Sequence, residues 1–487
     1  MGGFNKNGCI SIIAVLYIIK YLILGGKAMN KIVKTLSALV LSACFLCSCG
    51  SNGATTNGGE KDTKTVTENE SSSQIAKPEV KPADENSKLK ADIVYWSSYT
   101  ESSNYGQSIS AAADAFMKEN PEVKITISFQ GTDISSTLTP ALQAGNKITM
   151  FEANSDNVIC LWKDYCMDLG DFYAATYPQT GNKPYVDSIL PAYEILAKAQ
   201  GEGKYLYFPY TPQFLNIWYN KDIFDACGIT EKPKTWDELM DVCATLKKNG
   251  YTPFTSDQNH IDYNLSLYLE RLLGSEETNK LANGDGSEWD NPKVLEAVKK
   301  FEDAASKGYW ADNIMTVVTP EAQQEMVLDR KIAMYVCGSW MPNNVRESAG
   351  DDFRWGSFTY PLVENGADDG SSLCYGCYGI AINKNATPEE AEACAAFITY
   401  LTLGEWGDYM VNNCNAIPIT NDANAKWPEM IADAEHIYDG ITNRWPAHGD
   451  MRTNGDFLPT FQSACTKLYG GKMTAEDFVA ECKAYFK

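Results

Sequence analysis

The sequence predicts an α/β protein with two domains, and three observations lead to this prediction. Strand and helix patterns alternate from about residue 90 onward, as they do in α/β folds. Roughly 400 residues follow that point, which is more than one hydrophobic core usually holds. The preceding segment, 50–89, is rich in Ser, Thr, Asn, Gly, Glu and Lys, with almost no large apolar residue. Such a segment cannot bury enough apolar surface to order itself, so the folded part should begin near Ala91.

The first folded unit is expected to be a β-α-β unit. Residues 92–96 (DIVYW) form a short apolar strand pattern, and 123–129 (VKITISF) alternate with the period of a strand. Between them, 108–121 carries apolar residues on one helical face and ends at Pro121. The residues of that face are Ile109, Ala112, Ala113, Phe116 and Met117. Two strands joined by a helix open a parallel sheet.

Three later helices have recognisable starts. Thr235 and Glu238 form a capping box ahead of an apolar stripe. Asn291-Pro292 opens a second helix and Thr387-Pro388 a third, each with proline in the first turn. The apolar stripes of these helices are interpreted as core.

The N-terminal region has the pattern of a secretory signal. Met29 is followed by two lysines and by the apolar run 36–46, which is too short to span a bilayer comfortably. Residues 29–48 are therefore predicted to be a signal peptide, and 49–89 a flexible stalk. Residues 1–28 hold another apolar run, a candidate membrane segment. We interpret them as an extension upstream of the true start and leave them out of the fold argument.

The signal resembles those of bacterial lipoproteins, in which a small residue precedes a cysteine that becomes the lipidated N-terminus. Cys44 follows LSA and Cys49 follows LCS. Cys49 is favoured, because it leaves the longer apolar core and the polar run GSNG follows it directly. The resemblance implies a lipid anchor at Cys49 and a protein on the outer face of the cytoplasmic membrane. An ordinary secreted protein with incidental cysteines is the alternative.

Charge restricts the partners that the protein can have. The formal net charge is −22, and residues 1–49 contain five lysines and no acidic residue. The remainder of the chain is therefore more negative still. Such a surface repels nucleic acid and anionic lipid, so no nucleic-acid partner is expected. It suits a neutral or a cationic ligand.

Neither the cysteines nor the histidines indicate a metal, cofactor or redox site. Four of the 15 cysteines lie at or before Cys49, which leaves 11, an odd number without the spacing of a disulfide scaffold. Cys374 and Cys377 have the CxxC spacing, but they lead into an apolar strand pattern and not into a helix. The three histidines, His260, His436 and His448, are far apart in the sequence. We expect no cofactor and no metal.

Several stretches together resemble the extracellular solute-binding proteins of ABC importers, in the family that binds sugars and oligosaccharides. Their order and spacing follow that family over roughly residues 90–487. The stretches are IVYWSSYTES…AFMKENPEVKITISF, GKYLYFPYTPQFLNIWYNKDIFDACGI…PKTWDELMDVCATLKKNG, KIAMYVCGSWMPNN and GCYGIAINKNATPEEAEACAAFITYLT.

The resemblance implies a periplasmic-binding-protein-like fold that acts as a monomer. Each of two lobes would contain a mostly parallel sheet flanked by helices, with the ligand cleft at the hinge. Such proteins close around their ligand by hinge motion. The expected first lobe is 90–210 with 376–418, and the expected second lobe is 215–370 with 420–487. The chain would cross between them near 210–216, 362–375 and 417–420.

The ligand-binding residues are predicted from one rule and from the chemistry of sugars. Ligands of open α/β sheets bind outside the carboxyl ends of strands, which selects the loops after the predicted strands. A sugar presents an apolar face to aromatic rings and a rim of hydroxyls to carboxylates and amides. The predicted residues are Tyr99, Asp133, Glu152, Asn154, Tyr210, Trp340, Tyr375, Tyr378 and Trp445.

Trp340 leads this set, because the tryptophan of the family's Gly-Ser-Trp stacks on sugar. The following residues 341–344 (MPNN) indicate a loop, where a large aromatic is exposed. A core tryptophan is the alternative. Asp133, Glu152 and Asn154 could instead be helix caps. The stretch KITMFEANSDNV departs from common family members, which leaves the placement of Glu152 open.

Three hypotheses for function remain at this point. The first is a lipid-anchored binding protein, without catalytic activity, that delivers sugar to an ABC permease. The second is a surface glycosidase, which needs two carboxylates roughly 5–9.5 Å apart; Glu152 and Asp133 are a conceivable pair, but nothing in the sequence singles them out. The third keeps the fold but binds a polyamine or a peptide, because fold does not determine ligand.

Overall fold

The computed structural model describes residues 75–84, 87–319, 321–350, 352–446 and 449–487. Several N-terminal predictions lie outside the described residues. These are the extension 1–28, the signal peptide 29–48, the lipidation site at Cys49 or Cys44, and most of the stalk 49–89.

The described part of the stalk touches the folded region. Residues 75–84 and 87–90 contain no helix or strand. The Lys81 N–H nevertheless donates to Glu119 Oε1 at 3.1 Å, and Ser87 Oγ donates to Asn120 Oδ1 at 2.7 Å. Contacts with the fold therefore begin ahead of the first strand.

Strands and helices alternate through the described residues, which confirms the α/β class. The strands are β1 (Ala91–Ser97), β2 (Val123–Phe129), β3 (Met150–Asn154), β4 (Phe208–Asn220), β5 (Thr252–Thr255), β6 (Ile332–Gly338), β7 (Trp355–Phe358), β8 (Ser372–Ile382) and β9 (Asn443–Trp445). The first helices are α3 (Asn104–Glu119), α4 (Ile134–Gln143), α5 (Ser155–Trp162), α6 (Gly170–Ala174), α7 (Pro191–Gln200), α8 (Lys221–Ala226), α9 (Trp236–Lys248), α10 (Tyr263–Leu273) and α11 (Ser275–Asn283). The remaining helices are α12 (Pro292–Ser306), α13 (Glu321–Leu328), α14 (Met341–Asn344), α15 (Arg346–Ala349), α16 (Pro388–Thr402), α17 (Gly404–Cys414), α18 (Leu458–Tyr469) and α19 (Ala475–Ala484).

The strands pair in the order β2-β1-β3-β8-β4-β6-β5, with β7 also beside β4 and β9 beside β8. The pairs β1–β2, β1–β3, β5–β6 and β8–β9 are parallel. The pairs β3–β8, β4–β8, β4–β6 and β4–β7 are antiparallel. The sheet is therefore mixed and not mostly parallel as expected. The difference comes from the long strands β4 and β8, which run against their neighbours.

The predicted β-α-β unit is confirmed. β1 and β2 pair in parallel from Ala91 opposite Val123 to Ser97 opposite Phe129. Helix α3 starts four residues earlier than expected, because the Ser103 side chain accepts from the Gly106 N–H and so caps the helix.

The predicted helix starts are confirmed as well. In α9 the Glu238 N–H donates to Thr235 Oγ1 at 3.3 Å, and the Thr235 N–H donates back to Glu238 Oε2 at 3.3 Å. Asn291 caps α12 in the same way that Ser103 caps α3. Thr387 and Glu390 form a second capping box, at the start of α16.

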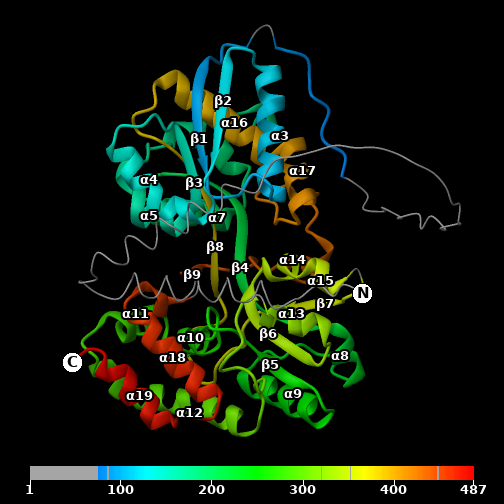
Figure 1. The fold of residues 1–487 in the computed structure, drawn as a ribbon, viewed down its shortest axis with the longest axis vertical. Coiled ribbons are helices and arrows are strands. Elements are labelled where there is room, and N and C mark those ends of the chain that lie inside the picture. Colours follow the sequence, from blue (N-terminus) through cyan, green and yellow to red (C-terminus); the bar gives the residue numbers. More distant parts are fainter. Residues whose placement is uncertain (1–74, 85–86, 320, 351, 447–448) are drawn as a thin grey trace, which may run out of the picture. The chain divides into compact units, whose positions relative to one another are not determined.

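The buried side chains form two separate hydrophobic clusters. One cluster includes Tyr95, Phe116 and Trp162 and lies mainly around β1, β2 and β3, the region that we call lobe 1, and it continues past the hinge strands to Trp218, Tyr335 and Trp355. The other includes Trp289 and Phe301 and lies around β5, β6 and β7, the region that we call lobe 2. In lobe 1, α3, α16 and α17 lie on one side of the strands and α4 and α5 on the other (Figure 1).

Strands β4 and β8 pass between the two lobes (Figure 1). The first part of β4, up to Phe214, pairs with β8, and its second part, Leu215–Asn220, pairs with β6 and β7. One continuous strand thus belongs to both lobes. The predicted chain crossing at 210–216 falls inside it.

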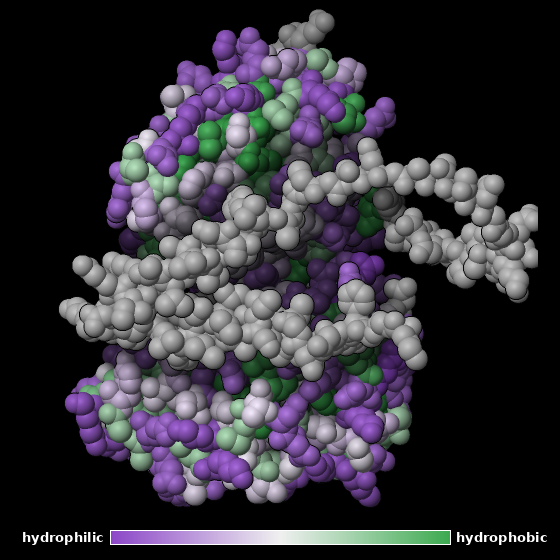
Figure 2. All heavy atoms as spheres, viewed as in Figure 1, coloured by the Kyte–Doolittle hydropathy of each residue, from purple (hydrophilic) through white to green (hydrophobic). Residues whose placement is uncertain are grey.

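Hydrophilic residues cover most of the outer ends of both lobes in the view of Figure 2, in keeping with the net charge of −22. Within the described ranges, no helix combines the length and the apolar character that crossing a membrane requires.

Candidate ligand site at the hinge strands

Three tyrosine rings are stacked at the carboxyl end of β1. The ring of Tyr99 lies 4.4 Å from that of Tyr105, at 10°, and 5.2 Å from that of Tyr378, at 19°. All three side chains are half-buried. Both faces of Tyr99 are therefore covered by neighbouring rings. Tyr105 was not predicted, because it belongs to the first turn of α3 and not to a loop after a strand.

Glu152 lies behind this stack and has no exposed surface, 0%. Its carboxylate accepts hydrogen bonds from the hydroxyls of Tyr95 and Tyr210, and from Ser97 Oγ at 2.5 Å. Burial raises the pKa of this carboxyl, and the hydroxyl donors counter only part of that effect. Tyr210 in turn meets the ring of Tyr378 edge-on, at 6.2 Å and 79°. Four of the predicted site residues thus form one chain of contacts, from Glu152 through Tyr210 and Tyr378 to Tyr99.

Trp340 follows the carboxyl end of β6 in lobe 2. The Ser339 N–H donates to the carbonyl of Phe214 on β4 at 2.8 Å, which fixes the start of this turn at the hinge strand. The ring of Trp340 lies over Gly338, where a Cβ atom would overlap it. The indole remains half-buried. It precedes the short helix α14, where the sequence had predicted a loop.

Hydrogen bonds connect the Trp340 turn with lobe 1. Asn343 Nδ2, one turn after Trp340, donates to the carbonyl of Cys414 at 3.1 Å. Asn413 Nδ2, beside Cys414, donates to Ser108 Oγ of α3 at 2.9 Å. Since α3 also carries Tyr105, these contacts place Trp340 and the tyrosine stack on the same side of the hinge strands.

A polar loop at the carboxyl end of β5 lies at the same edge of the lobe 2 sheet as the Trp340 turn, because β5 and β6 are parallel neighbours. Asp257 is fully buried, 0% exposed, and its carboxylate accepts from the Asn259 N–H at 2.8 Å and the Tyr335 hydroxyl at 2.5 Å. His260 Nδ1 lies 2.9 Å from both carboxylate oxygens. Burial by itself raises the pKa of Asp257, but hydrogen bonding and charge from His260, together with the other donors, outweigh it and lower the pKa.

The sequence offered a signal for this loop that the prediction missed. Residues 256–260 (SDQNH) follow a strand, so the rule that selected the other loops applies to them too. Arg452 Nη1 also donates to the Asn259 carbonyl at 3.2 Å. That contact joins residues 193 positions apart, and no local pattern indicates it.

Two acidic side chains, Glu270 and Asp450, are buried next to each other. The Asp450 N–H donates to Glu270 Oε1 at 2.7 Å, and both side chains are buried. Burial raises the pKa of Glu270 well above its ordinary value, and the negative charge of Asp450 raises it further. Such a pair is most stable when it holds a proton.

We therefore expect Glu270→Gln to stabilise the protein at alkaline pH. A raised folded-state pKa means that the carboxyl contributes stability below its unfolded pKa of about 4.3 and loses it as the pH rises through the folded pKa. Glutamine keeps the hydrogen-bond acceptor without the charge. The melting temperature at pH 8 should rise by about 2–4 °C, the change that 1 kcal/mol produces in a domain of this size.

Thermal unfolding followed by circular dichroism between pH 4 and pH 8 measures this effect. The gain should shrink toward pH 4. Glu302→Gln is the matched control, because Glu302 also accepts from one backbone N–H, that of Ala475 at 3.0 Å. A melting temperature for Glu270→Gln below that of the wild type at pH 8 would contradict the prediction.

Two predicted residues, Asp133 and Asn154, lie at or just after the carboxyl ends of β2 and β3 in lobe 1. Asn154 caps α5, since its Oδ1 accepts from the Asp156 N–H at 3.0 Å, so the helix-cap alternative describes its position. Asp133 is exposed at the end of the 3-10 helix Gly131–Asp133 and makes no side-chain cap bond to α4. Asn154 lies opposite Tyr378 in the antiparallel pairing of β3 with β8, so it is beside the tyrosine stack, whereas Asp133 follows β2 at the edge of the sheet.

Tyr375 and Trp445 lie apart from this group. Tyr375 and Tyr378 are three positions apart on β8, so their side chains leave opposite faces of the strand. Tyr375 and Trp445 line a separate groove of about 810 Å³ beside α7. Trp445 is only 2% exposed, and the guanidinium of Arg271 lies 4.8 Å from its ring centre. The structure thus divides the predicted residues between two faces.

Cys374 and Cys377 also leave opposite faces of β8, because they are an odd number of residues apart on a strand. Their sulfurs therefore do not face each other. In the part of the chain that the structure describes, no three His, Cys, Asp or Glu side chains are placed to hold a metal ion.

Two α/β lobes that share long strands, with aromatic and polar side chains gathered on one side of them, define a two-lobed solute-binding protein. The chain belongs to the family of bacterial extracellular solute-binding proteins, whose model matches residues 99–406. The match covers more than half of the chain.

Individual relatives agree with this assignment. The diacetylchitobiose-binding protein NgcE of Streptomyces coelicolor is 25% identical over 228 residues, which are 46% of this chain and 47% of that protein. The chain thus spans about half the length of this relative. The sn-glycerol-3-phosphate-binding periplasmic protein UgpB of Escherichia coli is 21% identical over 352 residues, 69% of this chain and 76% of its own.

Solved structures share the fold. RafE of Streptococcus pneumoniae, in its apo form, matches with a TM-score of 0.65 at 18% identity, over 83% of this chain and 99% of its own. RafE in complex with raffinose matches with a TM-score of 0.61 at 18% identity, over 82% and 99%. At this level of identity the likeness concerns the fold alone.

Proposed function

We propose that this protein is the lipid-anchored binding component of an ABC importer. It captures a sugar or an oligosaccharide between its two lobes, closes by hinge motion and delivers the ligand to a membrane permease. It acts as a monomer and has no catalytic role. The lobes are those predicted, 90–210 with 376–418 and 215–370 with 420–487.

One observation carries this proposal: aromatic rings and polar side chains approach the hinge strands from both lobes on one side. Lobe 1 contributes the stack of Tyr99, Tyr105 and Tyr378. Lobe 2 contributes Trp340, whose turn is hydrogen-bonded to β4, and the loop 256–260 at the same edge of the lobe 2 sheet. Rings cover the apolar face of a sugar, and hydroxyl, amide and carboxylate groups bind its rim. Diacetylchitobiose, which NgcE binds, and raffinose, which is bound in the RafE complex, belong to the same chemical class.

The glycosidase alternative finds little support in the geometry. Its acid pair would be Glu152 and Asp133, but Glu152 is buried and its carboxylate accepts from three protein hydroxyls. Such an acid has no open face toward a glycosidic bond. Asp133 is exposed on another element.

The test is a binding experiment on the chain from residue 50 onward. Diacetylchitobiose, raffinose and stachyose are titrated while tryptophan fluorescence and thermal stability are followed, with spermidine, a peptide mixture and sn-glycerol 3-phosphate alongside. A saturable response to one sugar, without release of product, supports the proposal. A response to spermidine or peptide alone would assign another ligand to the same fold, and turnover of sugar would indicate a glycosidase.

The lipid anchor has its own test. Cys49→Ala removes the predicted acylation site, so we expect the protein to move from the membrane fraction to the medium. Immunoblots of cell fractions measure the distribution, and Cys44→Ala serves as the matched control that should remain anchored. Retention of the Cys49→Ala protein in the membrane fraction would move the anchor to Cys44 or to residues 1–28.

A further inference from the structure

Strand β4 bends where it passes from one lobe to the other. Its pairing with β8 shifts register between Tyr210 and Gln213. Within this shift, Thr211 has a φ of 42°, in the left-handed region that β-branched residues rarely adopt. Local strain of this kind persists only where the surrounding structure enforces it. Contacts with neighbouring side chains must therefore keep β4 in this conformation at Thr211.

The contacts of Tyr210 identify what holds it. Tyr210 is the last residue paired before the shift, opposite Tyr378, and its side chain is buried. Its hydroxyl donates to the carboxylate of Glu152, which also accepts from Tyr95 and Ser97 on β1. One carboxylate thus joins β1, β3 and β4 immediately before the bend.

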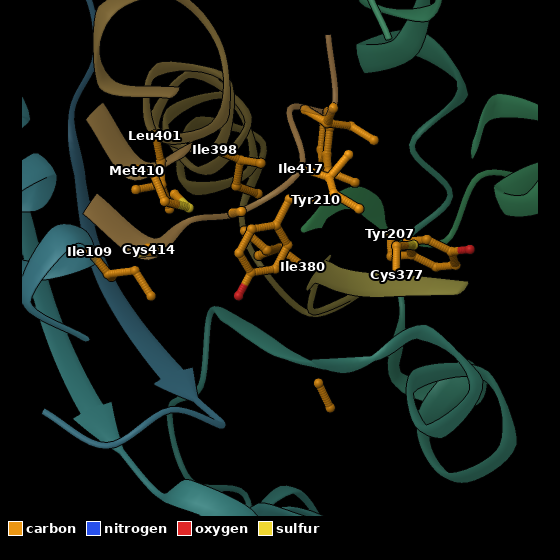
Figure 3. Close-up of a cluster of buried hydrophobic side chains, with 14 of the residues drawn as sticks. Ile109, Tyr207, Tyr210, Cys377, Ile380, Ile398, Leu401, Met410, Cys414 and Ile417 are labelled. Carbon is orange, nitrogen blue, oxygen red and sulfur yellow. The ribbon is translucent and has the colours of Figure 1, made fainter. Parts of the chain in front are cut away.

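The Tyr210 hydroxyl is directed to Glu152 and away from the neighbouring side chains of Tyr207 and Cys377. In Figure 3, Tyr207 lies beside Cys377, whereas the hydroxyl of Tyr210 points away from that pair. On its own side, Tyr210 meets Tyr378 edge-on at 6.2 Å, and Tyr378 stacks on Tyr99 at 5.2 Å. Tyr210 therefore adjoins both the bend of β4 and the tyrosine stack.

We propose that Glu152 is a positioning residue, whose carboxylate holds Tyr210 at the bend of β4 and thereby sets the angle between the lobes and the orientation of the tyrosine stack. This inference rests on the proposed function for its effect on sugar binding. Its effect on the lobe angle does not depend on any ligand. Glu152 accordingly influences binding without touching the sugar.

Four variants of the chain from residue 50 onward test the proposal. Glu152→Met keeps the side-chain volume but removes the acceptor, and Tyr210→Phe removes the donor. Glu152→Gln keeps one acceptor oxygen. Tyr400→Phe is the matched control, because its hydroxyl donates to Glu119 at 2.7 Å, a bond of the same kind at the other end of α3.

Small-angle X-ray scattering of the ligand-free protein measures changes in the angle between the lobes. Titration calorimetry with diacetylchitobiose, raffinose and stachyose reads affinity. We expect Glu152→Met and Tyr210→Phe each to change the scattering curve and to weaken sugar binding about fivefold or more, a usual size for coupling between sites. The double variant should be no worse than Glu152→Met. Glu152→Gln should recover most of the loss, and Tyr400→Phe should resemble the wild type.

Several results would overturn the inference. The first is a Glu152→Met protein whose scattering curve and sugar affinity equal those of the wild type. The second is a double variant in which the two losses of affinity multiply. The third is a Glu152→Gln protein that binds sugar as weakly as Glu152→Met. If Glu152→Met does not fold, Tyr210→Phe becomes the test of the proposal. A scattering curve of Tyr210→Phe equal to that of the wild type would then refute the role of Tyr210. If the wild type binds none of the sugars, the proposed function fails, while scattering still decides the role of Glu152.

Discussion

Replacing Trp340 with alanine is expected to weaken sugar binding by about 30-fold or more. Aromatic anchors in the centre of a binding site typically contribute at least 2 kcal/mol, which corresponds to that factor in affinity. The Trp340 ring lies over Gly338 at the carboxyl end of β6, half-buried beside the hinge strand. One ring face is therefore supported by backbone while the side chain keeps an exposed part for a ligand.

Isothermal titration calorimetry with the sugar found in the binding screen measures this loss. Trp340→Phe retains a smaller ring and should fall between the wild type and Trp340→Ala. Gly338→Ala keeps the indole but displaces it, so it should also weaken binding. Gly356→Ala is the control, because its Cβ would meet the ring of Tyr219 in the core of lobe 2. Unchanged affinity in Trp340→Ala would exclude Trp340 from the site.

Local sequence patterns predicted the local structure of this protein well. The capping box of Thr235 and Glu238 depends on residues three apart, and both of its hydrogen bonds are present. The β-α-β unit likewise depends on periodicity within about 40 residues. Such features are determined by neighbours in the chain, so a single sequence contains what is needed to predict them.

The direction of the strands was harder to predict, because it depends on the whole path of the chain. β8 pairs with β3, more than 200 residues earlier, and it runs antiparallel to it. Nothing in the apolar pattern of a strand records the direction of its neighbours. The expectation of a mostly parallel sheet was therefore wrong, although the α/β class was right.

The candidate site was predictable only in part, for a related reason. The rule for carboxyl ends of strands selected Tyr99 and Trp340, and it applies equally to the unpredicted loop 256–260. The burial of Glu152 depends on Tyr95 and Tyr210, which are 57 and 58 residues away. The separation of Tyr375 from Tyr378 follows from strand alternation, once the range of β8 is known.

Asp257 is the position where we expect the largest loss of stability. Its buried carboxylate accepts from Tyr335, Asn259 and His260, so Asp257→Ala leaves three donors without an acceptor. Loss of a buried, charged acceptor of this kind costs about 3 kcal/mol. Because the loop lies at the edge of the lobe 2 sheet that carries Trp340, we expect sugar affinity to fall as well.

The pH dependence distinguishes this electrostatic role from simple loss of packing. The folded-state pKa of Asp257 is lowered, so its contribution to stability is present above the unfolded pKa of about 3.9 and is lost as the pH falls through the folded pKa. Urea unfolding should therefore show the full difference between wild type and Asp257→Ala at pH 7 and a smaller one below pH 4. Asp133→Ala, at an exposed position, should change the free energy of unfolding by less than about 0.5 kcal/mol. If the difference in unfolding free energy between wild type and Asp257→Ala stays constant with pH, the side chain stabilises the loop through its volume. Its charge would then make no contribution to the stability of the loop.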